Sequence, residues 1–214
     1  MKKIVFLGSA GVGKGTYAQD VSAHYNIPTI STGQLLREQV KAKTDVGNEA
    51  IVYMDKGELV PTDIITKILK KRLLKSDSKK GFILDGYPRS MEQTEALAKI
   101  IDIDVAVNFT APTDVILARL GGRRTCANCG RIFHIKNVPP KKEGICDICG
   151  SKLIIRKDDQ PEAIKKRLDI YKKEVTPVLN YYKQKGILKH VDATVDYSIG
   201  GAKIIADTIK AIEE

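Results

Sequence analysis

The first residues that could do chemistry form a glycine-rich loop near the amino terminus. The apolar run Ile4–Leu7 leads directly into residues 8–16, which read GSAGVGKGT. A loop of this kind between a buried strand and a helix lets backbone N–H groups approach a phosphate. Lys14 offers an ammonium group to β- and γ-phosphate oxygens, and Thr16 offers a hydroxyl ligand to Mg²⁺. The loop therefore predicts nucleotide binding. Its candidate phosphate-binding residues are Gly11, Val12, Gly13, Lys14, Gly15 and Thr16.

The four cysteines form a second candidate site. They occur as Cys126-Ala-Asn-Cys129 and Cys146-Asp-Ile-Cys149, and a glycine follows each pair. Two C-x-x-C pairs at this separation are typical of a tetrahedral metal site with four thiolate ligands. Zinc is the expected structural metal, and iron and cobalt stay open because they also accept tetrahedral sulfur. A redox dithiol is disfavoured, since neither pair precedes a helix as in thioredoxin-like proteins.

Alternating apolar and amphipathic segments predict the elements that position these residues. Strands are expected near residues 3–7, 28–30, 81–85, 104–109 and 186–191, with helices between them. This alternation predicts an α/β fold in which a five-stranded parallel sheet carries helices on both faces. Gly8 and Asp85 then lie at the carboxyl ends of strands, where open parallel sheets bind ligands. We expect both residues to line one crevice.

Two segments interrupt the alternation of strands and helices. Residues 31–60 carry two helical patterns that divide near Thr44, and residues 123–159 carry the cysteines, several glycines and short β-like runs. The second segment is too short to bury a large core, so a metal cross-link is its expected stabiliser. Residues 1–30, 61–122 and 160–214 are left as the predicted core domain.

The composition indicates a globular protein that stays in the cytoplasm and does not enter a membrane. The apolar run that follows Met1-Lys2-Lys3 is too short for a signal peptide, and no stretch approaches the ~18 apolar residues of a membrane span. The net charge of +10 fits either nucleic acid or a cleft for two polyanionic nucleotides. Composition alone does not separate these two readings.

Further motifs follow the glycine-rich loop in a characteristic order. They are Ser31-Thr32-Gly33 with Arg37, Gly57–Pro61, Asp85-Gly86-Tyr87-Pro88-Arg89, Arg119 with Arg123, Arg156–Asp159, and Arg167. This set resembles the adenylate kinase family, in the long form whose lid carries a metal. The resemblance covers nearly the whole chain. It departs at Ser9-Ala10, where the family commonly has Pro-Gly or Pro-Pro, and at Ile132-Phe133, where a hydroxyl-bearing residue and tyrosine are frequent.

The resemblance implies reversible transfer of the terminal phosphoryl group of Mg·ATP to AMP, giving two ADP. It implies a P-loop NTPase-type core, an AMP-binding segment at residues 31–60 and a zinc-ribbon-like lid segment at residues 123–159. It also implies a monomer that binds ATP, AMP and ADP and no nucleic acid. The phosphate of AMP has a second pKa of about 6 and is already ionised, so the reaction requires no strong general base.

The resemblance also implies roles for single residues. Arg37 and Arg89 would hold the AMP phosphate, whereas Arg119 and Arg123 would hold the ATP phosphates. Asp85 would lie in the outer shell of Mg²⁺. The implied catalytic residues are Lys14, Asp85, Arg89, Arg123, Arg156 and Arg167. The implied AMP site comprises Thr32, Gly33, Arg37, Glu58, Leu59, Val60, Gly86, Tyr87, Pro88, Arg89, Gln93, Arg156 and Arg167. The implied ATP site adds Arg119, Arg123, Ile132 and Phe133 to the glycine-rich loop.

Several residues carry additional expectations. Gln93 has the donor and acceptor needed to read an adenine edge, but it is also the last member of a capping box that starts at Ser90. Asp158 and Asp159 could pair with arginines of the lid segment or cap the helix that begins near Pro161, and for Asp159 the cap is preferred. The pair Gly121-Gly122 predicts a hinge at the edge of the lid segment.

Three other functions stay open at this point. The first is a kinase that uses UMP, CMP or GMP as the acceptor. The second is a nucleic-acid-binding ATPase with a zinc ribbon, which predicts stacking aromatics on the ribbon, where only Phe133 is available. The third is a P-loop switch without an acceptor site, against which Arg37, Arg89 and Gln93 argue.

Overall fold

A five-stranded parallel sheet forms the centre of the molecule. The computed structural model describes residues 2–214 and gives the strand order β2-β3-β1-β4-β8. All neighbouring strands of this sheet pair in parallel. The strands are β1 (Lys2–Leu7), β2 (Thr29–Ser31), β3 (Gly81–Asp85), β4 (Val105–Thr110) and β8 (Leu188–Asp192). The predicted α/β fold, of the P-loop NTPase type, is confirmed.

The side chains of β1 point alternately into two hydrophobic clusters on opposite faces of the sheet. Val5 and Leu7 belong to one cluster, and Ile4 and Phe6 belong to the other. The unbroken apolar run of this strand is explained by burial on both faces, which is usual when helices cover both sides of a parallel sheet.

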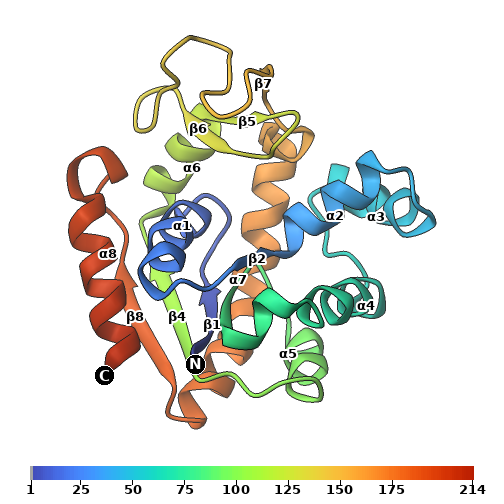
Figure 1. The fold of residues 1–214 in the computed structure, drawn as a ribbon, viewed down its shortest axis with the longest axis vertical. Coiled ribbons are helices and arrows are strands. Elements are labelled where there is room, and N and C mark those ends of the chain that lie inside the picture. The colour runs from blue at the N-terminus through green and yellow to red at the C-terminus, as the bar shows by residue number, and fades with distance from the viewer. Residues whose placement is uncertain (1) are drawn as a thin grey trace.

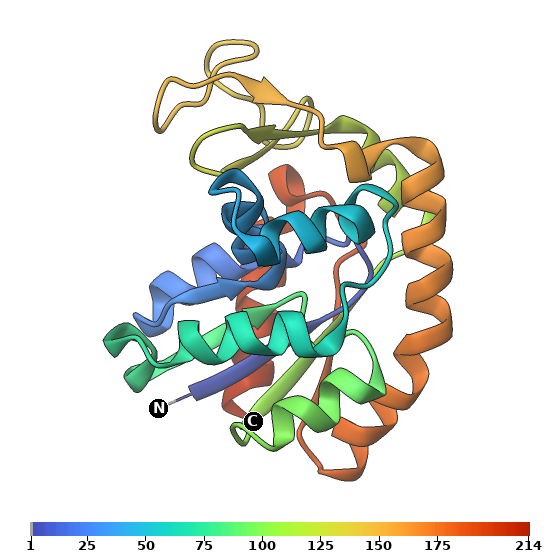
Figure 2. The same cartoon turned by 90° about the vertical axis from the view of Figure 1, so that its right-hand side faces the viewer.

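Helices from distant parts of the chain cover the two faces (Figures 1 and 2). Helices α1 (Lys14–Tyr25) and α8 (Tyr197–Glu213) pack on the face of Ile4 and Phe6. The opposite face is covered by α4 (Thr62–Leu73), α5 (Met91–Ala98) and α7 (Pro161–Gln184). Helix α6 (Thr113–Gly122) packs against α7, and the short helix η1 (Ser76–Lys80) precedes β3. No helix formed by residues 2–214 is both long enough and apolar enough to span a membrane.

Residues 31–60, which the resemblance predicts to bind AMP and which we call the AMP-binding segment, contain two helices, α2 (Thr32–Lys41) and α3 (Asp45–Asp55). They divide where the sequence predicts, because Thr44 caps α3 and accepts a hydrogen bond from the backbone N–H of Gly47 at 3.1 Å. In Figure 1 these helices project to the right of the sheet, beside α4.

The lid segment lies at the top of Figures 1 and 2 and contains a small antiparallel sheet. Its strands are β5 (Arg123–Cys126), β6 (Ile132–His134) and β7 (Leu153–Ile154), in the order β6-β5-β7. The short helix η2 (Lys157–Asp159) then leads into α7. Only Cys126, Phe133, Cys146 and Leu153 form its buried cluster. So small a core agrees with the expectation that the segment needs a cross-link.

The expected cap at Asp159 is wrong. Gln160 occupies the N-cap position of α7, without a side-chain cap, and Pro161 is the first helical residue. The carboxylate of Asp159 is buried and accepts hydrogen bonds from Arg123 and Arg167. Two cations hold this aspartate more strongly than a helix terminus could, because charge-assisted hydrogen bonds are stronger than neutral ones.

Because α3 packs closely on α2, the position of Gly47 should not tolerate a larger side chain. A Cβ atom there would lie 2.6 Å from the backbone nitrogen of Val40 and closer still to the carbonyl of Gln39. We expect Gly47→Ala to destabilise the protein by about 1–3 kcal/mol, measured by thermal or denaturant unfolding. Gly121→Ala in α6 is the control, since nothing lies within 4 Å of its added methyl group. That variant should be neutral or gain up to about 1 kcal/mol. Equal effects of the two substitutions would contradict the packing described.

Candidate functional site

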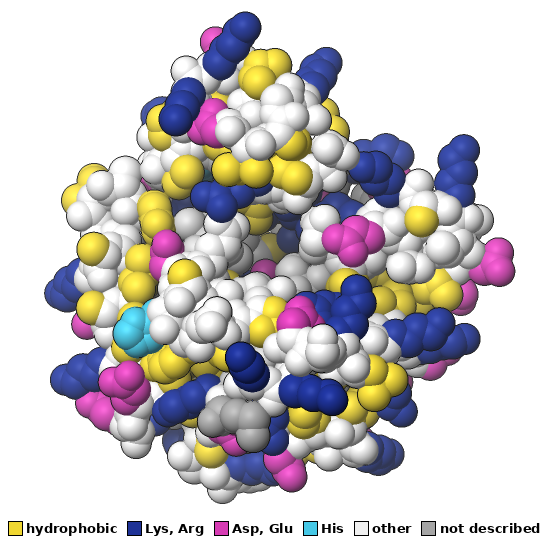
Figure 3. All heavy atoms as spheres, in the orientation of Figure 1, with side chains coloured by type: hydrophobic (Ala, Val, Ile, Leu, Met, Phe, Trp, Pro, Cys, Tyr) yellow, Lys and Arg dark blue, Asp and Glu magenta, His cyan; other side chains and the backbone are white. Residues whose placement is uncertain are grey.

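A cavity of about 270 Å³ lies between the sheet, the AMP-binding segment and the lid segment. Its floor is formed at the carboxyl ends of β1 and β3, where Gly8 and Asp85 both line it as predicted. In Figure 3 the surface is hollowed between the top of the molecule and its right-hand lobe, and Lys and Arg side chains lie in the hollow. The position agrees with the rule that open parallel sheets bind ligands beyond their carboxyl ends.

The glycine-rich loop lines the cavity through Gly11, Gly13, Lys14, Gly15 and Thr16. Gly13 is the N-cap of α1 with φ +112°, and a Cβ atom there would lie 2.6 Å from the ring of Tyr17. Only glycine fits this position without strain. Val12 differs from the other predicted loop residues, since its side chain is completely buried in the core and does not line the cavity.

Lys14 is held inside its own loop. Its Nζ donates to the carbonyl oxygens of Gly8 at 2.6 Å and Ser9 at 2.8 Å. Burial lowers the pKa of Lys14 to about 8; nearby arginines add to this effect, and Asp85 opposes it. The ammonium group is therefore desolvated, and an anion beside it would raise its pKa again.

Six arginines from four parts of the chain meet around this cavity. They are Arg37, Arg89, Arg119, Arg123, Arg156 and Arg167. Arg119 joins the loop to the segment after β8: its Nη1 donates to the carbonyl oxygen of Val12 at 3.0 Å, and its Nη2 donates to that of Val195 at 2.9 Å. Arg167 contacts the Asp158 carboxylate at 2.9 Å, and Arg123 contacts Asp159.

The remaining cations lack such partners. Within residues 2–214, Lys14, Arg37, Arg89 and Arg156 have no carboxylate oxygen within 4.0 Å of their charged groups. Burial, followed by the nearby Arg37 and Arg123, lowers the pKa of Arg156 to about 9. Arg89 is accessible to solvent inside the cavity, yet desolvation by the surrounding protein lowers its pKa as well. The site is thus strongly electropositive and suited to polyanions.

Two carboxylates moderate this charge. Asp85 ends β3, and its Oδ2 would lie 3.4 Å from a Cβ atom placed on Gly15. It is therefore next to the loop that carries Thr16. Burial alone would raise the pKa of Asp158, but Arg167 and Arg123 outweigh burial and hold the pKa below its ordinary value. Asp158 is thus ionised as their counter-ion.

Hydrogen bonds hold the residues that line the cavity between β3 and α5. Thr32 Oγ1 and Arg89 Nε both donate to the carbonyl of Gly86, at 2.9 and 2.8 Å. Gln93 Oε1 accepts from the backbone N–H of Arg89 at 2.9 Å, and Ser90 Oγ accepts from the N–H of Gln93. The amide oxygen of Gln93 therefore serves the helix start, and its NH₂ group is the part left to a ligand. All residues that were predicted for the AMP site line the cavity: Thr32, Gly33, Arg37, Glu58, Leu59, Val60, Gly86, Tyr87, Pro88, Arg89, Gln93, Arg156 and Arg167.

Ile132 and Phe133 of the lid segment also line the cavity, together with residues that the sequence did not indicate. Tyr171 and Val175 of α7 follow Arg167 at four-residue intervals and so share its helix face. This spacing was a usable signal, but nothing in the sequence placed that face against the loop. His134 also lines the cavity and packs over Gly122, where a Cβ atom would overlap its ring.

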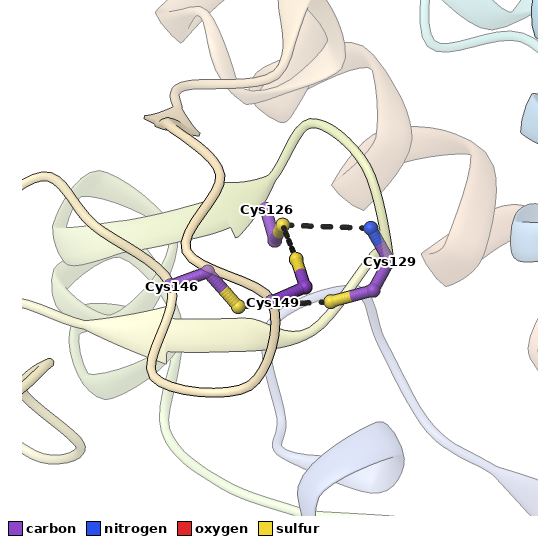
Figure 4. Close-up of side chains that lie close together, drawn as sticks. All are labelled: Cys126, Cys129, Cys146 and Cys149. Carbon is purple, nitrogen blue, oxygen red and sulfur yellow. Dashed lines mark hydrogen bonds between the residues drawn. The ribbon is translucent and has the colours of Figure 1, made fainter.

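The four cysteines converge at the edge of the lid segment (Figure 4). Their sulfur atoms all lie within 4.8 Å of one another, with Cys126 3.4 Å from Cys149 and Cys129 3.6 Å from Cys146. A tetrahedral site with metal–sulfur bonds of ~2.3 Å has sulfur–sulfur edges of ~3.8 Å. The donor set and its dimensions therefore fit one metal ion, and tetrahedral sulfur suits zinc, iron or cobalt.

Comparison with known proteins agrees with this geometry. A family profile described as "Adenylate kinase" matches residues 6–187. The chain belongs to the adenylate kinase family. It is 47% identical to an adenylate kinase of Caldicellulosiruptor saccharolyticus, over 98% of this chain and 96% of the relative. It is 46% identical to adenylate kinases of Methanosarcina acetivorans, over 98% and 97% of the two chains, and of Staphylococcus aureus, over 91% and 93%.

Within this adenylate kinase fold, loss of metal from the cysteine cluster should loosen the lid segment before the core. Because the segment buries few side chains, we expect chelation to abolish amide-exchange protection in residues 123–159 while β1, β3 and β4 stay protected. Hydrogen exchange with mass spectrometry, on protein loaded with one zinc per chain and then stripped, measures this directly. Unchanged protection of the lid segment after complete stripping would contradict a stabilising metal.

Proposed function

We propose that the protein catalyses reversible transfer of the terminal phosphoryl group of Mg·ATP to AMP, giving two ADP. The observation that carries the proposal is the cavity in which Lys14, Arg37, Arg89 and Arg156 share no carboxylate partner among residues 2–214. Membership of the adenylate kinase family supports the same conclusion. The triphosphate of ATP and the phosphate of AMP would supply the negative charge that such a cavity lacks.

On the donor side, the glycine-rich loop and Lys14 would hold the β- and γ-phosphates of ATP. Arg119 and Arg123 would bind the same phosphate chain, since planar guanidinium groups suit bidentate phosphate contacts. Thr16 would ligate Mg²⁺ directly, and Asp85 would do so through water. When bound, this ion neutralises charge on the β- and γ-oxygens.

On the acceptor side, Arg37 and Arg89 would fix the phosphate of AMP in line with the γ-phosphoryl group. That phosphate is ionised at neutral pH, so an oxygen of AMP attacks without prior loss of a proton to the protein. Arg156 and Arg167 would stabilise charge on the migrating group, an effect worth ~10³–10⁵ in rate in phosphoryl transfer. The lid and AMP-binding segments would close over both nucleotides and exclude water as a competing acceptor.

Selection of adenine follows from the orientation of Gln93. Its oxygen is committed to the N–H of Arg89, so its NH₂ group would donate to the ligand. A donor fits the unprotonated N1 of adenine and not the N1–H of guanine. The core at residues 1–30, 61–122 and 160–214, a monomeric state and a cytoplasmic location stay predictions of the sequence.

An acceptor screen with two substitutions tests the proposed reaction. With Mg·ATP we expect AMP to have a far higher kcat/KM than UMP, CMP or GMP in a coupled assay of ADP formation. Lys14→Ala and Arg89→Ala should each lose ~10³-fold or more in activity while keeping the fold. Arg124→Ala is the matched control, since Arg124 donates only to the carbonyls of Gly121 and Arg123 and does not line the cavity. A poor rate with AMP, or equal losses in all three variants, would refute the assignment.

The pKa of Lys14 predicts proton uptake on ATP binding. In the free protein this pKa is about 8, and neighbouring phosphates would raise it, so ATP binding should take up a proton near pH 9 and none below about pH 7. ATP affinity should fall correspondingly as the pH rises above 8. Calorimetry in buffers of different ionisation enthalpy counts the protons, and Lys14→Met should abolish the uptake. Identical uptake in that variant would assign the proton to another group.

A further inference from the structure

One glutamine of the AMP-binding segment touches the glycine that follows the first cysteine pair of the lid segment. Gln34 lies in the first turn of α2, and Gly130 follows Cys129 directly. A Cβ atom on Gly130 would lie 2.6 Å from Gln34 Oε1 and 2.7 Å from Nε2. The side-chain amide of Gln34 therefore packs directly on the α-carbon of Gly130. In Figure 2 the lid segment lies directly above α2.

A second contact joins the same two parts of the chain. Lys41, at the end of α2, donates from Nζ to Asn128 Oδ1 at 3.0 Å, and Asn128 stands between the first two cysteines. The cysteine turn thus contacts both ends of α2. Lys157 Nζ also lies 2.8 Å from a carboxylate oxygen of Asp55 in α3, but this ion pair is exposed to solvent and contributes little to stability.

The same amide of Gln34 also holds Arg37. Its Oε1 accepts from Arg37 Nε at 3.4 Å and from Nη2 at 3.3 Å, while its Nε2 donates to Glu38 Oε1 at 3.3 Å. Within residues 2–214 Arg37 makes no other side-chain hydrogen bond and no ion pair. A neutral amide orients the guanidinium group without neutralising it, so the charge stays available to an anion.

We propose that Gln34 is a positioning residue for the acceptor phosphate: seating of the Cys126–Gly130 turn on its amide fixes the orientation of Arg37. The inference rests on the proposed role of Arg37 in binding AMP. Closure of the lid segment and binding of the acceptor phosphate then share one contact. By linkage, each strengthens the other.

The chain offers a matched pair of glycines for the test. Gly130 has φ +74° and meets Gln34, whereas Gly150 follows the second cysteine pair with φ +70° and has nothing within 4 Å. Alanine at either position strains the backbone to a similar degree. Only alanine at Gly130 collides with Gln34.

The experiment measures KM for AMP and for ATP, kcat, zinc content and unfolding midpoint of the zinc-loaded protein. Gln34→Ala should raise KM for AMP about tenfold and leave KM for ATP within about twofold, as expected for loss of a hydrogen bond to a charged group. Gly130→Ala should raise KM for AMP several-fold more than Gly150→Ala does. The double variant Gln34→Ala/Gly130→Ala should match Gln34→Ala alone, because the collision is then removed.

The inference would be overturned by equal effects of Gly130→Ala and Gly150→Ala on KM for AMP, by additive effects in the double variant, or by equal changes in KM for AMP and ATP in Gln34→Ala. Unchanged KM for AMP in Gln34→Ala would also overturn it. A wild-type protein that does not phosphorylate AMP would instead refute the proposed function, so the two failures are distinguishable.

Discussion

Desolvation of cations that share one cavity is the constraint that the rest of the structure accommodates. Lys14, Arg37, Arg89 and Arg156 have no carboxylate oxygen within 4.0 Å among residues 2–214. Desolvation by the surrounding protein lowers the pKa of each, and more distant aspartates offset part of this effect. Asp158 and Asp159 form direct ion pairs only with Arg123 and Arg167 among residues 2–214. The free protein therefore holds an electrostatic strain that the phosphates of its substrates would relieve, which favours bound nucleotide over empty cavity.

Rigid and separate elements hold these charges together. Arg119 is fixed by carbonyl oxygens of the glycine-rich loop and of the segment after β8, and Arg167 projects from the long helix α7. Arg123 and Arg156 come from the small lid segment, which has little hydrophobic core of its own. A metal at the cysteines would stiffen that segment, and the contact between Gln34 and Gly130 extends its influence to α2. The arrangement of these charges thus depends on how the core, the AMP-binding segment and the lid segment pack together.

Sequence patterns predicted those features of the fold and the site that are determined by residues close together in the chain. The apolar run before Gly8, the division of two helical patterns near Thr44 and the spacing of Cys126 and Cys129 each carry a local signal, and the structure has the expected sheet, helix boundary and sulfur cluster. Tertiary partners were not predictable in this way. Asp159 became a counter-ion because β5 brings Arg123 to it. Val12 is buried because it packs into the cluster that also contains Tyr17 of α1 and Phe109 of β4. These outcomes follow from the fold rather than from the flanking residues.

The most direct measurement is the unfolding midpoint of an Arg156→Met variant, with and without a bisubstrate mimic of two adenosines joined by five phosphates. If the desolvated charge of the cavity destabilises the free protein, the variant should unfold at a higher temperature than the wild-type protein when free, and the mimic should stabilise it much less. Arg124→Met, outside the cavity, should change neither value. A free variant that unfolds at a lower temperature than wild type, while the mimic stabilises it fully, would contradict the account.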